Sequence, residues 1–136
     1  MKLKFALTTL FVVGLGNALA DTGSANDSYR AKILEERRKL TSCATEYLKK
    51  EAISTNKAAV QISSEAVEIC GKHFEAVEDA NIAAFKSVYP EEEYSEVVEW
   101  QESVREGNIW RSKRVLLEEG AIAVIKIRKQ QAENNK

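Results

Sequence analysis

Hydrophobic residues recur along most of this chain at spacings of three, four and seven, the period of an amphipathic helix. The first such stretch runs from about Tyr29 to Ile53, and its apolar stripe is Ile33, Leu40, Ala44, Tyr47 and Leu48. Residues 54–56 are Ser, Thr and Asn. These residue types compete with a helix for backbone hydrogen bonds. We therefore predict a helix over 29–53 and a turn at 54–56.

A second helix is predicted from about Lys57 to Tyr89. Two rows of residues repeat there every seven positions, as in the seam between packed helices. One row is Val60, Val67, Phe74 and Val88, and the other is Ser63, Cys70, Val77 and Ala84. In a chain this short the seam favours a bundle core over a dimeric coiled coil. Pro90 should end this helix at or before Tyr89.

Two more helices are predicted in the last third of the chain, separated by a turn at Gly107-Asn108. Residues 91–106 place Tyr94, Val97, Gln101 and Val104 on one face, and residues 109–130 carry the stripe Ile109, Leu116, Gly120, Ala123 and Ile127. Residues 121–127 are rich in β-branched side chains and could form a strand. No other part of the chain offers that strand a partner, so we predict a helix.

These patterns together predict an all-α fold, a small bundle of about four helices in a single domain at 29–130. After residue 28 only three glycines and one proline interrupt the chain. Residues 21–28 are small and polar and predict a flexible N-terminal arm, and residues 131–136 predict a polar tail.

The first twenty residues have the pattern of a secretory signal peptide. Lys2 and Lys4 precede an apolar run at 5–16, and Ala18-Leu19-Ala20 is a small-x-small cleavage site. The apolar run is shorter than the ~20 residues that span a bilayer. We therefore predict a signal peptide at 1–20, a mature chain that starts at Asp21 without a membrane span, and a periplasmic or secreted location.

Cys43 and Cys70, the only two cysteines, are 27 positions apart, and their midpoint lies between Asn56 and Lys57, at the end of the predicted turn. If the first two helices form an antiparallel hairpin, the cysteines face each other at the same height, where disulfide geometry is possible. An exported protein meets an oxidising compartment. The sequence therefore predicts a Cys43–Cys70 disulfide that staples the hairpin, and Gly71 is expected to ease the approach of the two helices.

The sequence contains few groups that could carry chemistry. A structural zinc site needs four ligands in paired motifs, whereas the chain has two cysteines and one histidine, His73. Phosphate-binding loops and nucleophile elbows are absent from the sequence. We predict no metal, no cofactor and no catalytic residue, and therefore not an enzyme. Without the leader the chain has 18 basic and 21 acidic residues, which argues against nucleic acid as a partner.

The remaining hypothesis is an exported protein that acts by binding another protein or a second copy of itself, by analogy with inhibitor or immunity proteins. The alternative is a small hydrolase, or a carrier of an apolar ligand held between Phe74, Phe85 and a tryptophan. The candidate partner surface comprises Trp100, Trp110, Ile122 and Ile125. Val115, Ile122 and Ile125 fall off the apolar stripe of the last helix. That helix is thus either central and fully buried, which we favour, or partly exposed as an interface.

The last two predicted helices also differ in charge. Residues 91–106 contain seven glutamates and one arginine, whereas residues 107–136 contain seven basic and three acidic residues. We expect the two helices to pack across the turn with complementary charge, which would fix their orientation more than their stability.

Overall fold

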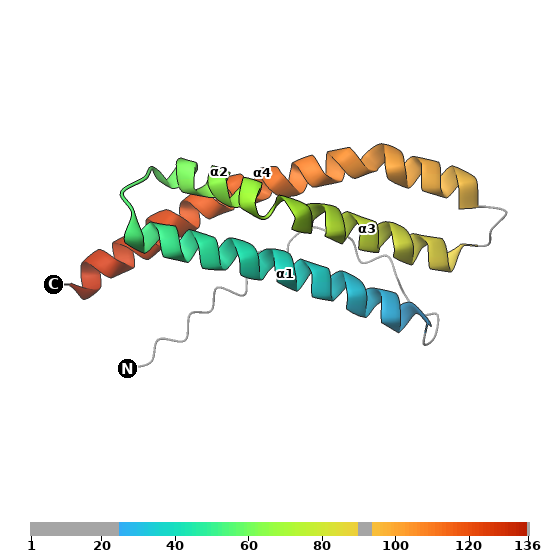
Figure 1. Cartoon of the computed structure of the whole chain (residues 1–136), viewed down its shortest axis with the longest axis horizontal. Coiled ribbons are helices and arrows are strands. Elements are labelled where there is room, and N and C mark those ends of the chain that lie inside the picture. The colour runs from blue at the N-terminus through green and yellow to red at the C-terminus, as the bar shows by residue number, and fades with distance from the viewer. Residues whose placement is uncertain (1–24, 90–93, 136) are drawn as a thin grey trace.

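The computed structural model describes residues 25–89 and 94–135, and every regular element in these ranges is an α-helix. The helices are α1 (Ala25–Ser54), α2 (Ala59–Ile69), α3 (Gly71–Val88) and α4 (Tyr94–Asn134). Figure 1 shows an elongated bundle in which α2 and α3 follow one another along α1, and α4 runs beside α3 and then behind α2. The predicted all-α bundle of four helices is confirmed, although the helices divide the chain differently.

The predicted signal peptide, residues 1–20, lies outside the described residues. Helix α1 begins at Ala25, inside the segment predicted as an arm, and ends at Ser54, within one residue of the prediction. The Ser54 hydroxyl donates to the Lys50 carbonyl, and the Thr55 hydroxyl donates to the Glu51 carbonyl, both at 2.8 Å. The Thr55 N–H also donates to the Glu51 carbonyl, at 3.1 Å. Bonds from Ser and Thr hydroxyls to backbone carbonyls compete with helical bonding, which is why these residues are favoured where a helix ends.

The helix predicted over 57–89 is in fact two helices, α2 and α3, which meet at Cys70. The Cys70 carbonyl accepts the His73 N–H at 2.9 Å, a tight turn that changes the direction of the chain. Helix α2 packs mainly against α4, whereas α3 packs mainly against α1. A straight helix could not follow both neighbours, and Gly71 costs a continuous helix about 1 kcal/mol.

The break changes which of the two predicted rows enters the core. Ser63, Cys70, Val77 and Ala84 are all buried. In the other row Phe74 is buried and Val67 packs against the core, but Val60 and Val88 are exposed. The row that contains the disulfide is therefore the true core seam of this segment.

The Cys43–Cys70 disulfide is present and joins α1 to the junction of α2 and α3. The two Cα atoms are 6.0 Å apart, and Cys70 is fully buried. The expectation for Gly71 is wrong, because a Cβ at that position would have no atom within 4 Å. The staple therefore forms without help from a small neighbour.

Helix α4 is continuous, so the predicted stop at Gly107-Asn108 is wrong. Contacts on both sides of the glycine hold the helix together. Arg105 pairs with Asp79 at 2.9 Å, and the Asn108 amide donates to the buried Glu78 carboxylate at 3.1 Å. These tertiary contacts outweigh the ~1 kcal/mol cost of an interior glycine. Residues 121–127 are helical as predicted, and the helix extends through most of the predicted polar tail.

Because the predicted turn at Gly107-Asn108 is absent, the prediction that two C-terminal helices pack with complementary charge is also wrong. The acidic and basic segments lie end to end on one helix of about 60 Å, at 1.5 Å per residue. They cannot pair with each other within one chain.

The core lies where α4 crosses α1 and α2. Ile62, Ala66, Leu116 and Val124 have no exposed surface. The predicted stripes supply most of the remaining core, namely Leu40, Ala44 and Leu48 from α1, Phe74 and Val77 from α3, and Ile109 from α4. Ile33 forms a second cluster with Ala80 and Ala84 at the other end of α1.

Candidate interaction surface

All four residues predicted for the partner surface lie on α4 and are exposed. The exposed fractions are 56% for Trp100, 62% for Trp110, 44% for Ile122 and 59% for Ile125. Leu116, on the opposite side of the same helix, has none. The favoured interpretation of a fully buried central helix is therefore wrong. Helix α4 contacts the other three helices along one stripe and leaves its outer face exposed.

The outer face of α4 is long rather than compact. Trp100 and Trp110 are about 15 Å apart along the helix axis, and Trp110 and Ile122 about 18 Å. Val115, 41% exposed, lies one heptad before Ile122 and extends the apolar surface between them. Side chains on this face are therefore spread over most of the helix.

Charged side chains are interleaved with these apolar residues and are partly ordered by them. The Arg114 guanidinium lies 5.6 Å from the centroid of the Trp110 ring, and its Nε donates to Glu118 at 2.8 Å. The three residues follow one another at i,i+4 spacing, where side chains on a helix are neighbours. Spacing alone could have predicted this row.

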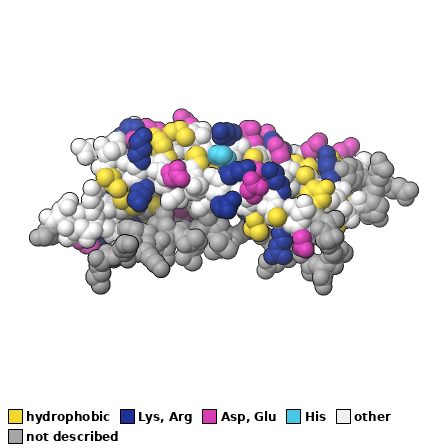
Figure 2. Space-filling view, turned by 60° about the horizontal axis from the view of Figure 1, so that its bottom comes forward, with side chains coloured by type: hydrophobic (Ala, Val, Ile, Leu, Met, Phe, Trp, Pro, Cys, Tyr) yellow, Lys and Arg dark blue, Asp and Glu magenta, His cyan; other side chains and the backbone are white. Residues whose placement is uncertain are grey.

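The face that carries α1 is different in character. In Figure 2 acidic and basic side chains are interleaved across it, and hydrophobic side chains form small separate groups among them. His73 is half-buried beside the buried Phe74, which agrees with a flank position.

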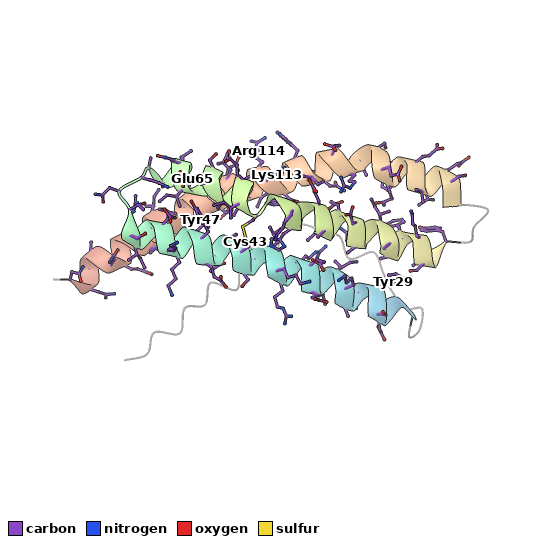
Figure 3. The ribbon with its side chains drawn as sticks, in the orientation of Figure 1. Tyr29, Cys43, Tyr47, Glu65, Lys113 and Arg114 are labelled. Carbon is purple, nitrogen blue, oxygen red and sulfur yellow. A yellow bond between two sulfur atoms is a disulfide. The ribbon has the colours of Figure 1, made fainter. Side chains whose placement is uncertain are left out.

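A polar cluster joins the ends of α1 and α2 next to the turn. Tyr47 and Glu65 point toward each other from these helices (Figure 3), and the Tyr47 hydroxyl donates to the carboxylate at 2.7 Å. Lys57 donates to the same carboxylate at 2.8 Å. No sequence pattern predicts this cluster, because its members come from different elements and follow no motif.

Hydrogen bonding shifts the pKa values within this cluster. Donation by Lys57, and then by Tyr47, holds the pKa of the Glu65 carboxyl below its usual value. The bond to Glu65 raises the pKa of Tyr47, and burial adds to that effect. The bond to Glu65 likewise raises the pKa of Lys57. The cluster is thus a charged clamp on the hairpin. Near neutral pH Glu65 is ionised, Lys57 is protonated and Tyr47 keeps its hydroxyl proton.

A shallow groove runs between α3 and the first half of α4. It is lined by Asp79, Ile82, Ala83, Lys86, Glu102 and Arg105, and the Arg105–Asp79 pair crosses it. The aromatic residues named for a ligand pocket do not gather here. Phe74 is in the core, Phe85 stacks on Tyr89 at 5.5 Å, and both tryptophans are on the outer face of α4.

In the described part of the chain, His, Cys, Asp and Glu side chains form no group of three that could hold a metal ion. None of the helices described in 25–89 and 94–135 is long and apolar enough to cross a bilayer. No family model matches the sequence, and comparisons with curated proteins and with solved structures give no match either.

Proposed function

We propose that this chain is an exported, non-enzymatic protein that acts by binding another protein through the outer face of α4. The observation that carries the proposal is the exposure of Trp100, Trp110, Ile122 and Ile125 on one helix whose opposite stripe is fully packed. Tryptophan is a frequent anchor of protein interfaces. An inhibitor-like or immunity-like role is the class of function that such a surface suits.

The test places a photo-crosslinking amino acid at position 125 in the full chain, produced with its own leader in its own cells. The matched control carries the same amino acid at position 34, because Leu34 of α1 is exposed to a similar extent, 56%. We expect a protein adduct from position 125 and none from position 34. Adducts at both positions, or at neither, would contradict the proposal.

Substitution tests the same surface. For this test the photo-crosslinking amino acid is placed at position 110. Ile122→Asp combined with Ile125→Asp should then abolish the adduct. Because both side chains are exposed, the free energy of unfolding should change by only about 1 kcal/mol or less. Leu34→Asp is the control and should leave the adduct intact. A double variant that still forms the adduct would overturn the assignment of this face.

A further inference from the structure

Charged side chains of opposite sign lie near the two ends of α4. Glu96 and Glu99 near its start, and Lys126 and Lys129 near its end, form no ion pair within the described residues. The single helix keeps the two groups tens of ångströms apart. Charged groups on another chain can pair with either group.

These groups are placed symmetrically along the helix. The midpoint of the arrangement lies between Ser112 and Lys113. Glu96 and Lys129 are equally far from it on opposite sides, and so are Glu99 and Lys126. If a second α4 lay antiparallel across this point, each acidic pair would lie at the height of a basic pair. Opposite charges at the same height attract and set the orientation of binding.

Four of the five large exposed apolar residues of α4 obey the same symmetry, whereas Ile122 would lie at the height of Ser103. Trp100 and Ile125 are equidistant from that midpoint, and so are Trp110 and Val115. All four are more than 40% exposed. A two-fold interface has to be self-complementary, with each patch meeting its mirror position on the other chain. Reversing α4 on itself satisfies this for these four apolar residues and for the four charged residues near the helix ends.

The centre of the symmetric face contains a like-charge mismatch, because Arg111 and Arg114 are mirror positions of each other. Glu118 offsets it in each chain, since it already pairs with Arg114. Gly107, the mirror position of Glu118, has no side chain, and nothing lies within 4 Å of the site of its missing Cβ. The acidic side chain of the opposite copy therefore has room at the centre.

From these observations we infer that the partner of this surface is a second copy of the chain, with the two α4 helices antiparallel across their outer faces. This inference rests on the proposed binding role of that surface. The attraction between exposed charges weakens with salt. Raising the salt concentration should therefore shift the equilibrium toward the monomer.

Sedimentation equilibrium on the full chain tests the inference by charge reversal. Glu96→Lys with Glu99→Lys, or Lys126→Glu with Lys129→Glu, should raise the dissociation constant of the dimer by about tenfold or more, because each pairing occurs twice. All four substitutions together should return it to near the unmodified value. Glu68→Lys with Lys72→Glu, at exposed sites on α2 and α3, should have no effect.

The orientation is measured with a spin label at position 130. Antiparallel helices centred between residues 112 and 113 would place the two labels about 50 Å apart, whereas parallel helices would place them close together. A short distance, a monomer at 100 μM, or a dimer indifferent to charge reversal would each overturn the inference. If the chain stays monomeric while position 125 still crosslinks to a different protein, the proposed function stands and only self-association fails.

Discussion

Gly120 of α4 lies against Ser63 of α2 so closely that a Cβ added to the glycine would be 3.0 Å from the serine Cβ and 3.4 Å from Leu48. The three helices of the core meet at this point. A serine Cβ is fixed to its backbone, so it cannot move away unless α2 moves. The close approach of two helices that was expected at Gly71, beside the disulfide, occurs at Gly120 instead.

We expect Gly120→Ala to destabilise the fold by about 1 kcal/mol, because overpacking outweighs the gain in helix propensity. Gly107→Ala is the matched control on the same helix, with open space around its Cβ. It should stabilise the monomer by about 0.5–1 kcal/mol. Urea unfolding measures both, and equal effects of the same sign would contradict the difference in packing.

Loss of the disulfide should cost much of the stability and little of the helix content. The staple closes a loop with a sequence separation of 27, for which the chain-entropy model gives about 3–4 kcal/mol. We expect Cys43→Ser with Cys70→Ser to unfold at much lower urea, as should the unmodified protein with reductant. Coincident transitions with and without reductant would refute a structural role.

The Tyr47–Glu65–Lys57 cluster should make stability depend on pH at both extremes. The pKa of Glu65 is lowered, so its contribution is present above its unfolded pKa and is lost as the pH falls below about 4. The pKa values of Tyr47 and Lys57 are raised, so their contribution is present below their unfolded values and is lost as the pH rises above about 10.

We therefore expect Tyr47→Phe to lower the unfolding midpoint most between about pH 5 and 9, and least outside that range. Tyr29→Phe is the control, since Tyr29 lies at the far end of α1 (Figure 3). Thermal melts across the pH range compare the two variants. A Tyr47→Phe effect that is the same at pH 3 and pH 7 would exclude the clamp.

Arg37 of α1 carries an Nε atom that is buried and has no hydrogen-bond partner in the described part of the chain. An unsatisfied buried donor costs about 1–3 kcal/mol. Arg37→Met keeps the long aliphatic stem and should stabilise the fold by about 1 kcal/mol. Arg38→Met, at the exposed neighbouring position, should change little. A destabilising Arg37→Met would mean that the guanidinium has a favourable role.

The mature chain should begin at Asp21 if the leader is cleaved as its pattern predicts. Intact-mass spectrometry of the protein from a cell-envelope extract should show a polypeptide of residues 21–136, two hydrogens lighter than the dithiol form. A full-length chain with Met1 confined to the cytosol would show that the N-terminal pattern is not a signal.

The sequence pattern correctly predicted those helices in which the residues of the apolar stripe are also the residues that neighbouring helices bury. The stripe of α1 and the stripe around Leu116 were found because burial and the helical period coincide there. The disulfide followed from the near-symmetric placement of the two cysteines about the turn after α1, where the Ser54 and Thr55 hydroxyls bond to backbone carbonyls.

The predicted helix boundaries were wrong where contacts between residues distant in sequence outweigh the local helix propensity. Gly107 was expected to end a helix, but Arg105 and Asn108 on either side of it are bonded to α3. Cys70 was expected inside a helix, but α2 and α3 face different neighbours. The Tyr47–Glu65 bond spans two helices, so no spacing within either one could have predicted it.

Helix α4, which completes the core together with α1 and α2, follows the other three described helices in the chain. A chain that emerges from its N-terminus presents the apolar stripes of α1, α2 and α3 before Leu116 and Val124, both fully buried, have been synthesised. The hairpin can close early, but its surface stays uncovered until α4 arrives. The core therefore cannot be completed until α4 has been synthesised, and the residues that would tie the hairpin to α4 are the last of its contacts to form.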